Sequence, residues 1–235
     1  VKRAAQLLQV SWAVVEEQCL RSALELGGNL VVDQRGSDTL LVPLDMRRRE
    51  ERVALDLTDR ARVPVPPLVK EVETVAHAIA SRRGLNAEQS LALQAVLSSA
   101  LTVVTGGPGT GKSYFCQALA ELAIQQHLAI LAAAPTGRAA QRLTEVAGLP
   151  ATTLHRLLEY QPGTGTFLRT VDFPLATAIL VIDEASMIDL VLFDHVLQAL
   201  PLDARLVLIG DVDQLPSVGP GQVLADIITS GVART

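Results

Sequence analysis

The sequence predicts an α/β protein built around a parallel sheet, with a small α+β segment before it. Four short apolar runs are each followed by a helical pattern, and a glycine-rich turn follows the first run directly. The runs are residues 101–105, 128–134, 178–182 and 204–209, and the helical patterns are residues 112–126, 138–147, 189–199 and 220–229. Runs that stay apolar, without alternating, are typical of parallel strands covered by helices on both faces. Ligands of such sheets bind where the strands end.

Composition limits the classes of protein that remain. A chain of 235 residues that is 49% hydrophobic can bury a sizeable core. No apolar run approaches the roughly 18 residues that cross a bilayer, so no membrane partner is expected. The net charge is -5 and aromatic residues make up 3% of the chain. Neither a basic nucleic-acid surface nor an extended base-stacking platform is therefore expected.

Cysteine usage favours the cytoplasm. Cys19 and Cys116 are far apart, and both fall in helical patterns. Two reduced, buried thiols explain them better than a disulfide does, and the four histidines form no ligand cluster. The chain begins with Val1 and not with methionine, so we expect a piece of a longer protein.

The first part of the chain has the order of a winged helix that lacks its first helix. The pattern predicts two helices and then two strands, at residues 2–9, 12–26, 29–33 and 39–43. Such a segment either contacts DNA or serves as a protein scaffold. The second helix carries Glu16, Glu17 and Glu25, which suit phosphates poorly, so the scaffold is favoured.

A proline-rich stretch marks a domain boundary. Residues 45–62 form a charged helical pattern, but residues 63–67, Val-Pro-Val-Pro-Pro, cannot continue a helix. We therefore assign residues 1–67 to the winged-helix-like segment with its connecting helix, and residues 68–235 to the α/β domain. That domain opens with a helix at 68–83, which Gly84 closes.

The turn at 106–113 has the pattern G-x-x-x-x-G-K-S between a strand and a helix. Its glycines let the backbone approach a phosphate, and its N–H groups and the following helix attract the anion. Lys112 reaches the β- and γ-phosphates, and Ser113 ligates Mg²⁺. A chance turn that ends in Lys-Ser is the weaker alternative. The predicted ATP-binding residues are Gln89, Gly106, Gly107, Pro108, Gly109, Thr110, Gly111, Lys112, Ser113 and Tyr114.

Gln89 has two readings, which are compatible with each other. Asn86 is a suitable N-cap, and Gln89 three residues later completes a capping-box variant. The functional alternative is that Gln89 hydrogen-bonds the adenine edge of the nucleotide.

Carboxylates follow two of the predicted strands, Asp183 and Glu184 after one and Asp211 after the other. Asp183 would hold Mg²⁺ through water, and Glu184 would act as general base toward the attacking water. A strand that ends in Asp-Glu is common by itself, but downstream of a phosphate loop the catalytic interpretation is favoured. Gln214 follows the last strand. It either senses the γ-phosphate or is a polar loop residue, and the spacing supports these two interpretations equally.

Between these motifs the chain contains a loop at 135–138, a predicted short helix at 152–158 and a predicted hairpin at 160–171. Five segments together resemble motifs I, Ia, Ib, II and III of superfamily-1 helicases. They are GGPGTGKS (106–113), APTGRAAQRL (134–143), TLHRLL (153–158), VIDEAS (181–186) and GDVDQLPSVGPG (210–221). The segment LNAEQ (85–89) resembles the Q motif, and the set is similar to the stand-alone RecD-type DNA helicases.

This resemblance implies a RecA-like P-loop NTPase sheet and an ATP-driven motor that moves 5′→3′ on single-stranded DNA in repair and recombination. It implies catalytic roles for Lys112, Glu184 and Gln214. It also implies DNA-backbone contacts from motifs Ia and Ib, although Arg138 and His155 can equally be ordinary polar helix residues. The residues implied in DNA binding are Pro135, Thr136, Arg138, Thr153 and His155.

The sequence departs from the family pattern in two ways. Motifs IV to VI, which carry the arginines of the γ-phosphate site, do not occur, and Tyr114 replaces the usual threonine. We therefore expect a monomeric motor fragment that needs a second RecA-like domain and unwinds nothing by itself. Two alternatives stay open, a winged-helix regulator with an AAA+-type ATPase and a superfamily-1 RNA helicase.

Overall fold

The computed structural model describes residues 29–35, 38–107 and 109–234. The chain divides into two compact units, Val1–Glu51 and Arg52–Thr235. The division falls before the boundary predicted between residues 67 and 68, which stays a prediction. The helices predicted at 2–9 and 12–26 lie outside the described residues, so the winged-helix assignment also stays a prediction.

The described part of the first unit is a hairpin and the start of a helix. Strands β1 (Leu30–Arg35) and β2 (Asp38–Pro43) pair antiparallel, close to the predicted ranges. Helix α3 (Leu44–Arg62) follows at once, as the charged pattern predicts. Arg47 and Glu51, one turn apart on α3, form an ion pair of 2.9 Å that is typical of a solvated helix face.

The second unit is built on the predicted parallel sheet, which has five strands in the order β3-β9-β8-β4-β5. The strands are β3 (Leu101–Thr105), β4 (Ile130–Ala134), β5 (Ala151–Thr153), β8 (Ile179–Ile182) and β9 (Arg205–Gly210). Every residue of β8 and β9 is buried. Their continuous apolar pattern therefore does reflect strands that are covered on both faces.

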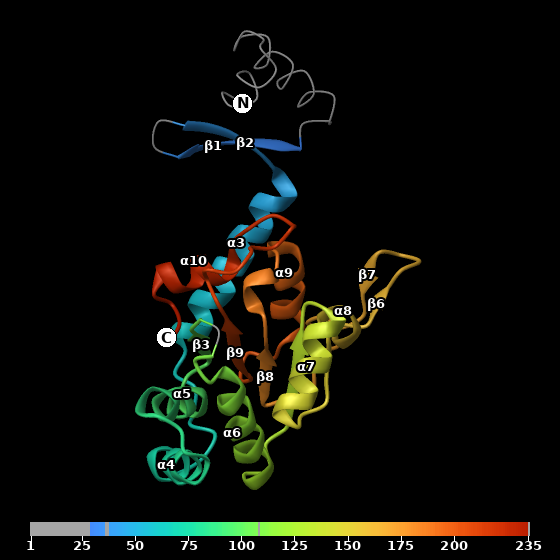
Figure 1. Cartoon of the computed structure of the whole chain (residues 1–235). Helices are drawn as coiled ribbons and strands as arrows, with labels where there is room; N and C mark the ends of the chain where they lie inside the picture. The colour runs from blue at the N-terminus through green and yellow to red at the C-terminus, as the bar shows by residue number, and fades with distance from the viewer. Residues whose placement is uncertain (1–28, 36–37, 108, 235) are drawn as a thin grey trace. The chain divides into compact units, whose positions relative to one another are not determined.

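Helices cover both faces of this sheet (Figure 1). They are α4 (Val72–Arg83), α5 (Ala87–Ser98), α6 (Lys112–Gln125), α7 (Gly137–Ala147), α8 (Leu154–Leu157), η1 (Ala185–Met187), α9 (Leu190–Ala199) and α10 (Val223–Ser230). One core joins α4 to α7 with alternate strand residues such as Ile179, Val181 and Val207. The intervening residues, such as Leu180 and Leu206, are buried on the opposite face.

The second half of α3 belongs to the second unit, and a buried arginine fixes it there. Arg60 is 2% exposed. Its Nε donates to Asp56 at 2.5 Å, and its other nitrogens donate to the carbonyls of Leu200 and Pro201 at 2.7 and 2.8 Å. The Pro201 carbonyl also accepts from the N–H of Ala204 at 3.1 Å, whereas the Leu200 carbonyl follows the end of α9 and takes its donor from Arg60.

Some predicted helices differ in extent from the observed ones, and the one predicted at 220–229 begins only at Val223. The short helix predicted at 152–158 is wrong at its start, because Thr152 and Thr153 belong to β5. Their β-branched side chains suit an edge strand, and only Leu154–Leu157 is helical. The helix predicted at 68–83 begins later, at Val72, and Gly84 closes it in the left-handed conformation as predicted.

Cys116 is a free, buried cysteine, as predicted for a reduced thiol, and Cys19 lies outside the described residues. Burial, with the nearby charge of Asp183, raises the pKa of the Cys116 thiol to about 12. Across residues 29–35, 38–107 and 109–234, no helix is long and apolar enough to cross a membrane. The same residues hold no cluster of three or more His, Cys, Asp or Glu side chains suited to a metal ion.

Candidate active site

The carboxyl ends of the five parallel strands form one edge of the sheet, and the predicted motifs follow one another along it. Thr105 of β3 lies opposite Gly210 of β9, and Ile182 of β8 lies opposite Leu208 of β9. The phosphate loop, Gln214 and the two acidic residues therefore come from three adjacent strands. The motifs with predicted DNA contacts follow the next two strands, β4 and β5.

The phosphate loop takes the backbone conformation that its glycines allow. Gly109 and Gly111 have φ values of 82° and 86°, which other residues rarely adopt. Lys112 opens α6, and its Nζ donates to the carbonyl of Gly107 at 3.0 Å and also to the carbonyl of Gly106. The loop thus holds the lysine ammonium at the place where phosphate oxygens would compete for it.

Gln89 ties the start of α5 to the phosphate loop. Its backbone N–H donates to Asn86 Oδ1 at 2.8 Å, and Asn86 N–H donates to Gln89 Oε1 at 3.1 Å, which confirms the capping box. Its Nε2 donates to the carbonyls of Thr110 and Gly111 at 3.3 Å each. A Cβ on Gly111 would lie 2.4 Å from that nitrogen, so the contact requires glycine. The role of Gln89 in adenine recognition stays a prediction.

The remaining loop residues have simpler surroundings. Ser113 and Tyr114 are exposed in the first turn of α6, and Tyr114 is 61% exposed. The Thr110 hydroxyl donates within the loop to the carbonyl of Gly107 at 2.9 Å. Pro108 lies outside the described residues. Ser113 is therefore accessible for the predicted metal contact, which stays a prediction.

Asp183 lies half-buried where β8 ends, and its N–H extends the sheet by donating to Ala133 at 3.0 Å. Burial raises the pKa of Asp183 above its ordinary 3.8. The N–H of Glu184, 2.9 Å from Oδ1, and the charges of Lys112 and Arg142 oppose this rise. The carboxylate thus faces a partly dehydrated position near the phosphate loop, where a cation would stabilise its charge. Sequence reasoning had not included Arg142, an exposed residue of α7.

Glu184 adopts an unusual backbone conformation. Its φ is 54°, in the left-handed region, immediately before η1. A residue other than glycine held in this region costs about 1–3 kcal/mol, and such strain clusters at functional sites. The conformation separates the environment of Glu184 from that of Asp183, although the two are consecutive.

A buried carboxylate organises the loop that carries Gln214. Asp211 is 4% exposed, and its Oδ1 accepts from the N–H of Asp213 at 3.0 Å. Its Oδ2 lies 3.5 Å from Gln214 Nε2, and its carbonyl accepts from the Gln214 N–H at 3.3 Å. Gln214 is exposed and has local hydrogen bonds, so its role as a γ-phosphate sensor stays a prediction. Asp211 belongs to the segment compared with motif III, but no role was predicted for it, although its place directly after a buried strand is a signal.

In motif Ia, Thr136 caps the helix that follows it. The Thr136 hydroxyl accepts from the N–H of Ala139 at 3.2 Å and caps α7. Arg138 is exposed in the first turn of this helix, and Pro135 is half-buried before it. The cap and the exposed cation fit a helix N-terminus that faces an anion. Contact of these residues with DNA stays a prediction.

Motif Ib also begins with a threonine that caps a helix. The Thr153 hydroxyl accepts from the N–H of Arg156 at 3.2 Å and caps α8. His155 is exposed, and its ring lies 5.5 Å from Tyr160 and 5.7 Å from Phe167. These two aromatic residues lie on β6 (Tyr160–Gln161) and β7 (Thr166–Phe167), the hairpin predicted at 160–171. The ring contacts give His155 a packing role, and DNA contact by Thr153 and His155 stays a prediction.

Comparison with curated proteins gives helicase relatives, among them RecD proteins and a DNA helicase B. The chain is 45% identical over 141 residues to the ATP-dependent RecD2 DNA helicase of Deinococcus radiodurans, a match that covers 60% of this chain and 19% of the relative. It is 38% identical over 208 residues to the RecBCD enzyme subunit RecD of Mycobacterium tuberculosis, which covers 77% of this chain and 34% of the relative. The chain thus spans about a fifth to a third of these relatives. They confirm the resemblance to RecD-type superfamily-1 helicases.

Among solved structures, the Pif1 helicase from Candida albicans matches 57% of this chain and 34% of its own, at 28% identity and a TM-score of 0.43. The family model described as "AAA domain" matches residues 89–220, which run from Gln89 past the loop of Gln214. Because this match covers more than half of the sequence, the chain belongs to the AAA domain family.

Proposed function

We propose that this chain is the ATP-binding part of a helicase motor, and that the whole protein couples ATP hydrolysis to 5′→3′ movement along single-stranded DNA. The observation that carries the proposal is the order of motifs along one sheet edge, with nucleotide residues after β3, β9 and β8 and the predicted DNA residues after β4 and β5. The helicase relatives support the same assignment.

The residues of the site suggest a division of labour. The loop N–H groups and the N-terminal end of α6 bind the phosphates, and Lys112 exchanges the carbonyls of Gly106 and Gly107 for phosphate oxygens. Glu184 accepts the proton of the attacking water. Gln214, whose Nε2 lies 3.5 Å from Asp211 at the neighbouring strand end, would sense the γ-phosphate.

The donor set fits Mg²⁺, which prefers oxygen ligands. Ser113 contributes a hydroxyl that is open to solvent, and Asp183 contributes a carboxylate whose burial favours a nearby cation. When bound, Mg²⁺ neutralises phosphate charge as it develops during phosphoryl transfer. The oxygens of Ser113 and Asp183 would orient it at the end of the loop.

The partners follow from the same site. Thr136 and Arg138 would contact the phosphates of single-stranded DNA, and Thr153 and His155 would extend this path. A second RecA-like domain would close over the nucleotide and add arginines to it. We propose a monomer in the cytoplasm, where the buried thiol of Cys116 fits a reducing environment. Size-exclusion chromatography with light scattering tests whether the protein is a monomer.

Unwinding assays with the whole protein test the proposed function. We expect it to unwind duplexes with a free 5′ tail and not those with a free 3′ tail. Equal unwinding from both tails, or a preference for the 3′ tail, would contradict the polarity. Competition between single-stranded DNA and RNA of the same sequence tests which of the two nucleic acids the protein prefers. Stronger inhibition by RNA would favour the RNA-helicase alternative.

A further inference from the structure

Helix α6 carries a polar stripe on an otherwise apolar helix. Ser113, Gln117, Glu121 and Gln125 recur at intervals of four residues, so they lie on one face. Most of the other side chains of α6 are buried in the core. The stripe starts at the phosphate loop with Ser113 and runs along α6 to the other end. Its middle members have no part in the nucleotide site.

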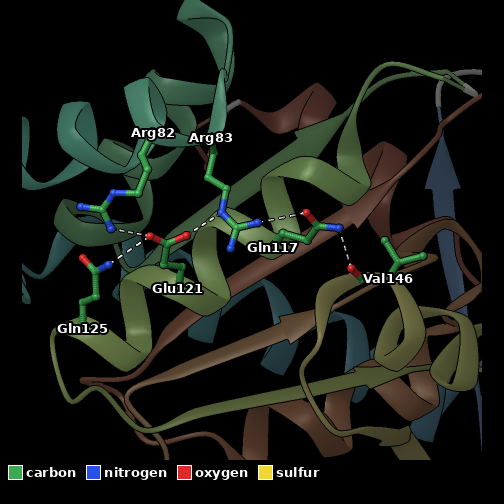
Figure 2. Close-up of polar contacts among 6 residues, drawn as sticks. All are labelled: Arg82, Arg83, Gln117, Glu121, Gln125 and Val146. Atoms are coloured by element: carbon green, nitrogen blue, oxygen red, sulfur yellow. Dashed lines mark hydrogen bonds and ion pairs between the residues drawn. The ribbon is translucent and has the colours of Figure 1, made fainter.

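Gln117 joins α6 to α7. Its Nε2 donates to the carbonyl of Val146 at 2.7 Å, in the last turn of α7 (Figure 2). This carbonyl cannot use the N–H four residues further on, because that residue is Pro150, which has none. Gln117 therefore supplies a donor that the helix end needs, and it does so from the helix that begins at the phosphate loop.

Arg83, at the end of α4, contacts this glutamine directly, and Arg82 contacts the glutamate one turn further along α6. Arg83 Nη1 donates to Gln117 Oε1 at 3.3 Å, and Arg83 Nε donates to Glu121 at 2.5 Å. Arg82 contacts the other oxygen of Glu121 at 2.6 Å (Figure 2). With its oxygen facing Arg83, the Gln117 amide must present its nitrogen to Val146. The amide is thus constrained from both sides.

The connection lies one helical turn from the predicted nucleotide site in α6, and it reaches α7 at the end opposite the predicted DNA residues. Gln117 stands one helical turn after Ser113, which the proposed function places at the metal. Val146 stands near the end of α7, whose N-cap is Thr136 and whose first turn carries Arg138. Rigid secondary elements and the hydrogen bonds that join them can carry energetic coupling between sites, and α6, Gln117 and α7 form such a chain.

We propose that Gln117 is a positioning residue that couples the phosphate-binding end of α6 to α7, so that nucleotide binding orders the first turn of α7. The proposal rests on the proposed function, since it requires nucleotide at the loop and uses the helix assigned to DNA contact. In this arrangement Gln117 acts through Val146 and touches neither ligand.

Hydrogen exchange of the chain with and without Mg·ADP tests this coupling in peptides that cover residues 136–142. Gln117→Leu keeps a side chain of similar size but removes the hydrogen bonds to Val146 and Arg83. Gln117→Glu keeps an acceptor for Arg83 but directs an oxygen at the Val146 carbonyl. Gln125→Leu is the matched control, because Gln125 lies on the same helix and its amide donates to Glu121 of α6 at 3.0 Å, not to α7.

We expect Mg·ADP to slow exchange in the first turn of α7 by about fivefold or more in the unchanged chain and in Gln125→Leu, the size of common couplings between sites. Both Gln117 variants should bind Mg·ADP with unchanged affinity and lose this effect. If they keep it, or if exchange only rises uniformly with the nucleotide effect intact, Gln117 is a structural brace and the proposal is wrong. An unchanged chain that binds Mg·ADP without any effect on α7 also overturns it. An unchanged chain that binds no Mg·ADP would instead overturn the proposed function.

Discussion

The backbone N–H of Glu184 donates to Oδ1 of Asp183 over 2.9 Å, and Glu184 itself adopts a left-handed φ of 54°. Two consecutive acids therefore occupy different environments. Asp183 ends a buried strand, and its charge is disfavoured by burial. Glu184 starts the following turn. This difference is what two separate roles, metal ligand and general base, require.

The first prediction concerns Glu184. In ATPase assays of the whole protein, Glu184→Gln should spare nucleotide binding and lower turnover by about 10²–10⁴-fold, because it removes the proton acceptor without changing the shape of the side chain. Nucleotide titrations beside steady-state rates measure both properties. Glu73→Gln, at an exposed position of α4, is the control. Undiminished hydrolysis in Glu184→Gln would exclude this residue as the base.

The second prediction concerns pH. Hydrogen bonds from Arg83, and then from Arg82, hold the pKa of Glu121 below its ordinary 4.5. The ionised carboxylate therefore stabilises the fold above pH 4.5, and this contribution is lost as the pH falls through the lower, folded-state pKa. Glu121→Gln should reduce stability at pH 7, by at most about 1 kcal/mol because the pairs are partly exposed. Urea denaturation at pH 7 and pH 3 tests whether the difference disappears in acid. A difference of the same size at both values would show that the charge is not its cause.

The third prediction concerns the buried Arg60. Arg60→Met should destabilise the chain by about 1–3 kcal/mol, because the buried carbonyl of Leu200 loses its donor and that of Pro201 keeps only the N–H of Ala204. Arg62→Met, two residues later on the exposed face of α3, is the matched control and should be near neutral. Chemical denaturation measures both variants. Equal stabilities would mean that water replaces the arginine.

The sequence predicts those parts of the fold that have local signals. Gly109 and Gly111 mark the phosphate loop, because its backbone needs positive φ. The run from Ile179 to Ile182 identifies a buried strand and therefore places Asp183 at its end. Asn86 and Gln89 form a capping box that depends only on residues three apart. Each of these signals lies within a few residues of what it specifies.

Other features depend on contacts between distant residues, and the sequence alone does not reveal them. Thr152 and Thr153 form a strand only because β4 offers them an edge. The amide of Gln89 reaches Thr110 and Gly111 through the packing of α5 against the loop. The bond from Gln117 to Val146 depends on how α6 and α7 meet. The four-residue spacing of the polar stripe on α6 can be seen in the sequence, but the residues that the stripe contacts cannot.

The central claim is that the loop from Gly106 to Ser113 binds nucleotide through Lys112. The most direct measurement is equilibrium titration of the chain with a fluorescent Mg·ADP analogue, beside Lys112→Ala and the exposed control Lys70→Ala. We predict saturable one-to-one binding by the unchanged chain and by Lys70→Ala, and binding weakened at least about tenfold in Lys112→Ala, the loss of one charge-assisted hydrogen bond to phosphate. Equal affinity in all three proteins, or no binding by any, would contradict the account.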